Sequence, residues 1–247
     1  MSMTFNRKTA FTAIYTERYV LSLVFLYRAW IEFHKPWPSW PGLVGQPAIE
    51  SAVLVAAGRH ANLLLLDLFM GLLLLLGRRV DVLPQKLKYI LVPLVSTFFY
   101  LTYSDISWFP TSFQKNLCPP GLQMPITIAG LVLIILGPVV AMWSVLYLGR
   151  SFGIFVMVRK VVFGGPYRWV RHPMYLGWIG MCIGVALANF TGACLLLITI
   201  HIFLLLYRAR LEESQLSEYS AEYREYMKRT GFIIPRFRRP AGASLEA

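Results

Sequence analysis

Residues 164–213 contain the side chains with the clearest capacity for chemistry. A basic and aromatic stretch, GGPYRWVRHPMYLGW, opens this segment, and RARLEE closes it after two apolar runs. Arg208 and Glu212 stand four residues apart and therefore share one face of a helix. A surface pair of this kind contributes little to stability, but charged groups at the end of a membrane helix commonly have a function. We expect His172 and Tyr175 to face the same layer as this pair and to form one pocket with it.

The loop before this turn, residues 148–172, interleaves five Arg and Lys residues with aromatic side chains. Such a loop is typical of a cytosolic membrane surface, and it could equally attract an anionic or planar ligand. Pro173 indicates the first turn of a helix, because proline is well accommodated there. His172, immediately before it, could instead form a hydrogen bond with a ligand at the helix N-terminus.

Two further patterns in this region favour packing over ligand contact. Small residues at close spacing permit close approach of helices, here Gly177, Gly180 and Gly184. A stripe at helical spacing follows the second apolar run and consists of Leu216, Tyr219, Tyr223 and Tyr226.

The composition indicates a polytopic, all-α membrane protein. Apolar residues make up 57% of the 247 residues, mean hydropathy is +0.56, and several apolar runs are long enough to cross a bilayer. The net charge of +12 does not indicate nucleic-acid binding, because the basic residues cluster beside the apolar segments. The three cysteines are scattered without metal-ligand spacing, so we predict no metal site.

The apolar pattern predicts a bundle of about six transmembrane helices. They span roughly 14–33, 59–77 (with a possible backward extension through 48–57), 86–104, 123–147, 173–189 and 191–209. A charged cytosolic helix is expected from 210 to about 230, and a proline- and tryptophan-rich stretch, HKPWPSWPGLVGQP, should lie at headgroup level.

The basic residues predict how the bundle is oriented. Of the 24 Lys and Arg residues, 20 lie in the N-terminal segment, the 78–88 and 148–172 loops and the tail from 208. The positive-inside rule therefore places both termini and the 164–213 segment in the cytoplasm. The membrane would be the plasma membrane of a bacterium or the endoplasmic reticulum of a eukaryote.

Three charged residues fall inside the predicted apolar spans, namely Arg28, Glu32 and Asp67. They could line a route by which a lipophilic molecule reaches the pocket. Alternatively, Arg28 and Glu32 could pair with each other at i,i+4.

Several motifs together resemble the isoprenylcysteine carboxyl methyltransferase family of integral membrane enzymes, a group related to phospholipid N-methyltransferases. The motifs are LGRSF (148–152), GPYRWVRHPMYLGW (165–178), RxxxEExxL (208–216), EYREY (222–226) and Ile234-Pro235. The resemblance covers 148–235 and leaves residues 1–147 without a match. It divides the chain into an N-terminal transmembrane scaffold (1–147), a methyltransferase-like region (148–235) and a basic tail (236–247).

The resemblance implies S-adenosylmethionine as cofactor and a set of residues that contact it. By position these are Arg159, Lys160, Val161, Val162, Tyr167, His172, Pro173, Met174, Tyr175 and Glu212. Arg208 matches the family's substrate-side arginine and is the expected catalytic and substrate-binding residue.

Methyl transfer from a sulfonium needs a nucleophile aligned behind the methyl group and protection from water. A carboxylate acceptor is already ionised at pH 7, and Arg208 could position it. An amine or thiol acceptor must lose a proton, which makes His172 or Glu213 a candidate base. A membrane location implies a lipophilic, lipid or lipidated acceptor.

Two alternative functions remain open at this stage. Sterol reductases that use NADPH have a similar HPNYLGD turn, but this chain has Met174 and Trp178 at the positions where they have Asn and Asp. A non-enzymatic lipid-binding protein would have no affinity for either cofactor.

Overall fold

The computed structural model describes residues 12, 14–34, 47–77, 80, 84, 86–104 and 106–236, with the backbone alone for 47–56, 58, 59, 62 and 63. Over these ranges the protein is helical and contains no strand. Its longer helices are α2 (Ser22–His34), α3 (Pro47–Leu75), α4 (Lys88–Phe98), α6 (Pro120–Leu148), α7 (Pro173–Ala188), α8 (Gly192–Tyr219) and α9 (Ala221–Arg229). The shorter helical elements are the π-helix η1 (Thr16–Leu21), the short α-helix α5 (Leu101–Ser104) and the 3₁₀ helices η2 (Thr111–Phe113), η3 (Gly149–Ser151) and η4 (Gly165–Arg168).

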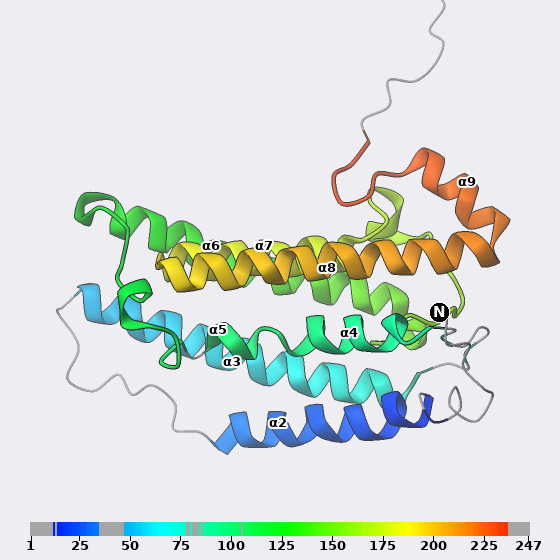
Figure 1. The fold of residues 1–247 in the computed structure, drawn as a ribbon, viewed down its shortest axis with the longest axis horizontal. Helices are drawn as coiled ribbons and strands as arrows, with labels where there is room; N and C mark the ends of the chain where they lie inside the picture. Colours follow the sequence, from blue (N-terminus) through cyan, green and yellow to red (C-terminus); the bar gives the residue numbers. More distant parts are fainter. Residues whose placement is uncertain are drawn as a thin grey trace, which may run out of the picture.

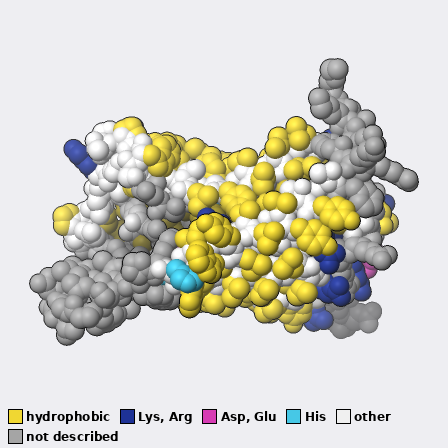
Figure 2. Space-filling model, turned by 90° about the horizontal axis from the view of Figure 1, so that it is seen from below, with side chains coloured by type: hydrophobic (Ala, Val, Ile, Leu, Met, Phe, Trp, Pro, Cys, Tyr) yellow, Lys and Arg dark blue, Asp and Glu magenta, His cyan; other side chains and the backbone are white. Residues whose placement is uncertain are grey.

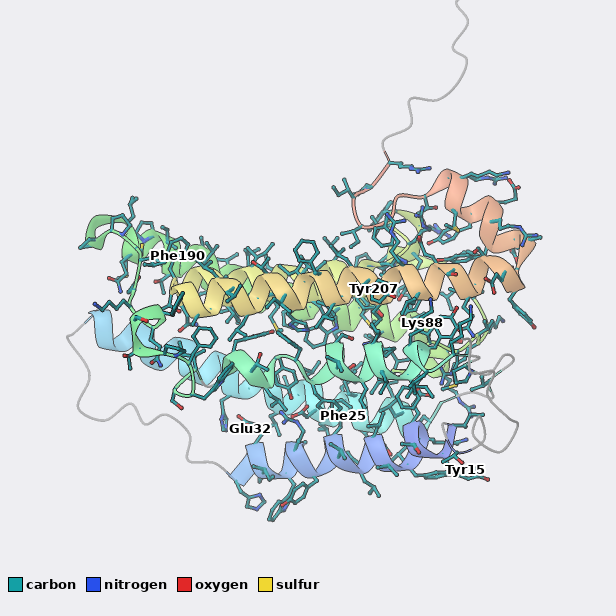
Figure 3. The ribbon with its side chains drawn as sticks, viewed as in Figure 1. Tyr15, Phe25, Glu32, Lys88, Phe190 and Tyr207 are labelled. Atoms are coloured by element: carbon teal, nitrogen blue, oxygen red, sulfur yellow. The ribbon has the colours of Figure 1, made fainter. Side chains whose placement is uncertain are left out.

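The long helices lie side by side and reverse direction along the chain (Figure 1). Tyr15, before α2, and Lys88, at the start of α4, lie toward the end of the bundle that carries α9, whereas Phe190, in the α7–α8 turn, lies at the opposite end (Figure 3). The end of α6, the start of α7 and the C-terminal part of α8 also lie toward the α9 end (Figure 1). The 164–213 segment therefore starts and finishes at one end of the bundle, as its sequence predicts.

The predicted helix ranges agree with the observed ones at most positions. The backward extension of the second segment is confirmed, because α3 is continuous from Pro47 to Leu75. The third segment is divided into α4 and α5 at residues 99 and 100. The HKPWPSWPGLVGQP stretch lies almost entirely outside the described residues, as do residues 237–247 of the basic tail.

The separate charged helix predicted from residue 210 to about 230 is present as α9, but its predicted start was wrong. Helix α8 continues without interruption through the RARLEE motif and ends at Tyr219. The break comes at Ser220, whose extended backbone leaves α8 and whose hydroxyl accepts a hydrogen bond from the Tyr223 N–H (3.1 Å). Because serine is a favoured N-cap, it ends one helix and starts the next.

Glycines bring α6 and α7 into backbone contact. A Cβ added at Gly177 would lie 2.5 Å from the Gly137 carbonyl oxygen, and one at Gly184 would lie 2.6 Å from that of Gly130. The predicted close packing is confirmed at these two positions, since no larger residue fits without separating the helices. Gly180 is different, because its added Cβ would meet no atom closer than 3.9 Å.

The outer surface of the bundle is apolar over much of its length. Apolar side chains cover the face in Figure 2, and Lys and Arg side chains gather at its right-hand end, the end at which α8 and α9 meet. In the described part of the chain, Pro120–Ser151 and Gly192–Tyr219 are long and apolar enough to cross a membrane. Exposed leucines and aromatics of this kind are unfavourable in water and suit a lipid environment.

The charged groups predicted inside the spans pair between helices. Arg28 Nε lies 3.2 Å from Asp67 Oδ2, and its guanidinium lies 5.1 Å from the centre of the Tyr100 ring. Glu32 is paired with His60 Nδ1 at 2.9 Å. Instead of the alternative ion pair between Arg28 and Glu32, two pairs join α2 to α3.

Candidate active site

The loop between α6 and α7 forms one wall of the site. Helix α6 ends at Leu148, the φ of 51° at the following Gly149 favours glycine, and the chain then turns back across the end of the bundle. Apolar side chains of this loop are buried, among them Phe152, Ile154 and Val156. The Val156 N–H donates to the Tyr89 carbonyl at the start of α4 (3.0 Å), which fixes the loop against the N-terminal half of the chain.

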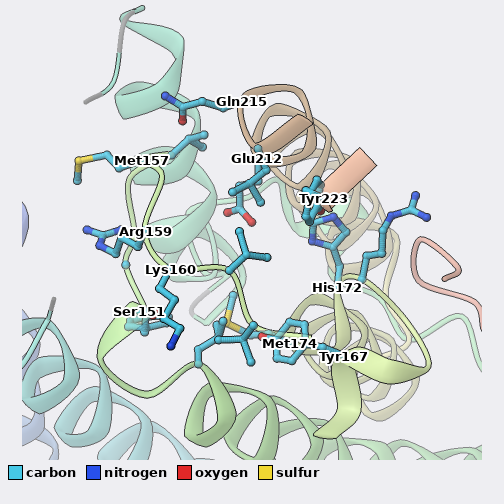
Figure 4. Close-up of a pocket in the computed structure, with 18 of the residues that line it drawn as sticks. Ser151, Met157, Arg159, Lys160, Tyr167, His172, Met174, Glu212, Gln215 and Tyr223 are labelled. Carbon is cyan, nitrogen blue, oxygen red and sulfur yellow. The ribbon is translucent and has the colours of Figure 1, made fainter. Parts of the chain in front are cut away.

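A cavity lies between this loop, the start of α7, the C-terminal part of α8, and α9 (Figure 4). Nine of the ten residues predicted to contact the cofactor line it, namely Arg159, Lys160, Val161, Val162, Tyr167, His172, Met174, Tyr175 and Glu212. The exception is Pro173, which is buried as the first residue of α7 and sets the start of that helix. We call this space the loop cavity.

Glu212 and Arg208 meet Tyr175 beside the loop cavity. The Tyr175 hydroxyl donates to Glu212 Oε1, and Arg208 Nε lies 3.4 Å from the same oxygen. The Arg208 guanidinium also lies 5.6 Å from the centre of the Tyr175 ring. In Figure 4 the Glu212 carboxylate points into the cavity, where it can accept hydrogen bonds from a ligand or balance a cationic group.

Arg208 faces a second space, which the sequence did not predict. Its side chain is buried, and its Nη1 and Nη2 donate to Thr97 Oγ1 (2.9 Å) and the Ile154 carbonyl (2.7 Å). This second space, the helix cavity, lies among α2, α3, α4, α7 and α8 and is mostly apolar; Arg208 lies at its polar part, beside Ser96, Thr97 and His201. The two cavities share the lining residues Phe152, Met174 and Tyr175. They are therefore adjacent.

A buried ion cluster fastens the α7 start to α8 and α9. Arg171 Nε donates to Glu213 Oε1 (2.5 Å), and its Nη1 donates to the Met227 carbonyl (3.1 Å) and the Thr230 carbonyl. His172 Nε2 lies 3.3 Å from the same Glu213 oxygen. Glu213, which the sequence left as a candidate base, does not line the loop cavity and acts instead as the shared anion of this cluster.

The tyrosine stripe, which was predicted to favour packing, both packs and borders the site: Tyr223 is buried, and the Tyr226 ring packs against those of Phe163 and Tyr223. Leu216, Tyr223 and Tyr226 line the loop cavity, whereas Tyr219 is exposed. Helix α9 turns back over the site at Ser220, which the helical spacing alone could not reveal. Burial raises the pKa of the Tyr223 hydroxyl above its ordinary value, so this phenol stays neutral at physiological pH.

Arg159 lines the loop cavity, but its guanidinium is held by a partner that sequence reasoning missed. Its Nη2 donates to the buried carboxylate of Glu17, in η1. Figure 4 shows the Arg159 guanidinium directed away from Glu212. The sequence offered one signal for this contact: an acidic residue at the start of the first apolar run, where a solvated side chain is not expected.

Known proteins resemble this region. Residues 125–222 match the family model described as phospholipid methyltransferase. The chain is 35% identical over 143 residues to protein-S-isoprenylcysteine O-methyltransferase of Saccharomyces cerevisiae, covering 54% of this chain and 55% of the yeast protein. It is 29% identical over 140 residues to the Homo sapiens protein of the same name, covering 52% and 48% of the two chains.

The predicted resemblance to the isoprenylcysteine carboxyl methyltransferase family is confirmed. The family model begins at residue 125, so the expectation of no match before 148 was too narrow, and the matched stretch includes most of α6. The chain spans about half the length of these curated relatives. A solved structure of the eukaryotic intramembrane Ras methyltransferase, isoprenylcysteine carboxyl methyltransferase, aligns with 95% of this chain and 98% of its own at 21% identity, with a TM-score of 0.42.

Proposed function

We propose that this chain is an integral membrane methyltransferase that uses S-adenosylmethionine and acts on a lipophilic acceptor at the cytosolic membrane face. The observation that carries the proposal is the junction of the two cavities at Tyr175, with Glu212 facing one and Arg208 facing the other. A carboxylate on one side and a guanidinium on the other suit a cationic methyl donor and an anionic acceptor. In this proposal 148–235 performs the transfer, and 1–147 supplies the scaffold.

The loop cavity fits the chemistry of S-adenosylmethionine. Glu212 can accept hydrogen bonds from hydroxyl or ammonium groups, and charge-assisted hydrogen bonds of this kind are the strong ones. Neutral phenols from Tyr167, Tyr223 and Tyr226, together with apolar loop residues, can pack against a planar ring and exclude water. Burial raises the pKa of Tyr167 as well, so its hydroxyl stays neutral.

The helix cavity fits an acceptor that partitions into lipid. Its lining is mostly apolar, and Arg208 provides a buried cation next to the shared Tyr175 wall. The yeast and human relatives are named for methylating an isoprenylcysteine. We propose a lipophilic molecule or lipidated peptide that ends in a carboxylate, and an amine or thiol acceptor is the alternative.

A carboxylate acceptor would need no general base. Bound S-adenosylmethionine would supply an electrophilic methyl group. A carboxylate oxygen already carries the electron pair that forms the new O–C bond as the S–C bond breaks, so no proton is transferred. Arg208 would orient that oxygen while its contacts with Thr97 and Ile154 keep the guanidinium in place.

The membrane arrangement in this proposal has six passes. These are α2 with η1, α3, α4 with α5, α6, α7 and α8, and α9 would lie on the cytosolic surface. The basic residues at the α9 end of the bundle support a cytosolic location for the site (Figure 2).

An NADPH-dependent reductase fits the loop cavity less well. Its cofactor carries several phosphates and is best held by unpaired cations. Of the three Lys and Arg side chains that line the loop cavity, Arg159 and Arg171 are each paired with a buried carboxylate, Glu17 and Glu213, which leaves Lys160 as the cation for several phosphates. Calorimetry on the detergent-solubilised protein distinguishes the two functions: we expect S-adenosylhomocysteine to bind and NADPH not to bind. Binding of NADPH alone, or of neither ligand, would exclude the proposal.

A further inference from the structure

Glu17 holds the loop that forms a wall of the loop cavity. Glu17 lies in η1 and is 3% exposed. Oε1 accepts hydrogen bonds from the backbone N–H groups of Ile154 (2.5 Å) and Phe155 (2.7 Å). Oε2 accepts from the Arg159 guanidinium. One side chain from the N-terminal scaffold therefore fixes three groups of a loop more than a hundred residues away.

Ile154 links Glu17 to the acceptor-side arginine. Its N–H donates to Glu17, and its carbonyl accepts from Arg208 Nη2 (2.7 Å). Ile154 is fully buried, so neither contact competes with water. A displacement of the loop at Ile154 would therefore move both the wall of the loop cavity and the guanidinium that faces the helix cavity.

Gly153 leaves room for the Arg159 guanidinium beside the loop backbone. A Cβ at this position would lie 2.1 Å from Arg159 Nη1 and 2.5 Å from its Cζ. The guanidinium thus occupies the space that a side chain at residue 153 would fill. Since φ of Gly153 is not positive, close approach and not backbone conformation is the reason for glycine here.

We infer that Glu17 is a positioning residue for methyl transfer, which sets the loop for the cofactor and Arg208 for the acceptor. The inference rests on the proposed function for the identity of the ligands. A buried carboxylate is stable only when it is paired, and here its partners are loop groups that also border the loop cavity, Phe155 and Arg159. Glu17 also lies in the π-helix η1, and π-helical turns are frequent at functional sites.

The test compares Glu17→Gln with Glu225→Gln as a matched control. Glutamine keeps an oxygen for the backbone N–H groups and loses the charge that pairs with Arg159. Glu225 is an exposed carboxylate on α9, paired with Lys228 at 2.7 Å and absent from the lining of both cavities. Three kinds of measurement are made in detergent: hydrogen exchange at the Ile154 and Phe155 amides, binding of S-adenosylhomocysteine, and steady-state kinetics (KM and kcat) with a lipophilic carboxylate acceptor.

We expect Glu17→Gln to accelerate amide exchange at Ile154 and Phe155 and to raise the KM for S-adenosylmethionine. We also expect kcat/KM to fall by about 100-fold, the scale of a misplacement near 1 Å. Glu225→Gln should behave as wild type. If the role of Glu17 is purely structural, Glu17→Gln lowers Tm, and its KM and kcat measured at a temperature well below that Tm equal those of the wild type. This result, or slow amide exchange in Glu17→Gln, overturns the inference.

Gly153→Ala tests the same contact from the loop and covers the case in which Glu17→Gln does not fold. The added methyl displaces the Arg159 guanidinium from Glu17, so the same loss of amide protection and cofactor affinity is expected. Wild-type values of both in Gly153→Ala would contradict the inference. Amide exchange needs no ligand. If the wild type binds no S-adenosylhomocysteine, the proposed function fails, and the exchange data still decide whether Glu17 holds the loop.

Discussion

Replacing Glu212 should remove most of the affinity for the methyl donor without unfolding the protein. The carboxylate points into the loop cavity, accepts from the Tyr175 hydroxyl and lies 3.4 Å from Arg208 Nε. A hydrogen bond to a charged group contributes about 1.5–3 kcal/mol, and 1.4 kcal/mol corresponds to about tenfold in affinity. Loss of one such bond in Glu212→Gln should therefore weaken binding by about 10- to 100-fold.

Glu212→Ala removes every hydrogen bond that the carboxylate accepts, so we expect binding to fall below detection. Arg208 keeps its contacts with Thr97 and Ile154 in this variant, so its buried charge is not left without partners. The assay is titration calorimetry with S-adenosylhomocysteine on protein that elutes as wild type in size exclusion, with Glu225→Gln as the control. Wild-type affinity in folded Glu212→Ala would refute the assignment of the loop cavity to the donor.

Three further predictions follow from the geometry. Arg208→Ala should keep S-adenosylhomocysteine affinity, measured by calorimetry, within about threefold and lower kcat by about 100-fold, because Arg208 acts on the reacting group and not on donor binding. Equal losses of affinity and turnover would contradict the acceptor-side position of Arg208. Gly177→Ala should lower Tm by several degrees because the new methyl meets backbone at 2.5 Å, whereas Gly180→Ala, with no atom closer than 3.9 Å, should leave Tm nearly unchanged; similar Tm values in the two variants would contradict the close helix contact. Burial raises the folded-state pKa of Tyr167, so the unfolded state loses the phenol proton first as pH rises. The contribution of Tyr167 to stability should therefore be complete below about pH 10 and decline above it, and Tyr167→Phe should reduce the fall of Tm between pH 9 and pH 11.

The helices could be predicted from the sequence because apolar run length and proline position depend on local composition. The α6–α7 contact was also predictable, since Gly177 and Gly184 at small-residue spacing have few other uses in an apolar helix. The end of α8 was not predictable in this way. RARLEE looks like a change from membrane to water, but its residues all favour a helix, and the chain breaks only where Ser220 caps α9.

The candidate site was predictable where one motif supplies several neighbouring residues. The HPMY turn and the Arg208–Glu212 pair are each local, and one helix hairpin returns them to the same end of the bundle. The contacts of Glu17 and Thr97 were not predictable, because their partners lie far away in the sequence and depend on how η1 and α4 pack. The place of Tyr223 at the loop cavity was not predictable either, because periodicity identifies a helical face and does not reveal what that face covers.

The most direct test of the account is methyl transfer itself. Membranes containing the protein are incubated with S-adenosylmethionine labelled in its methyl group, and lipid, protein and volatile fractions are then separated. We predict label in lipid or lipidated protein that is released as methanol by alkali, as expected for a methyl ester, and its absence with Glu212→Ala. No transfer above that of membranes lacking the protein would contradict the account.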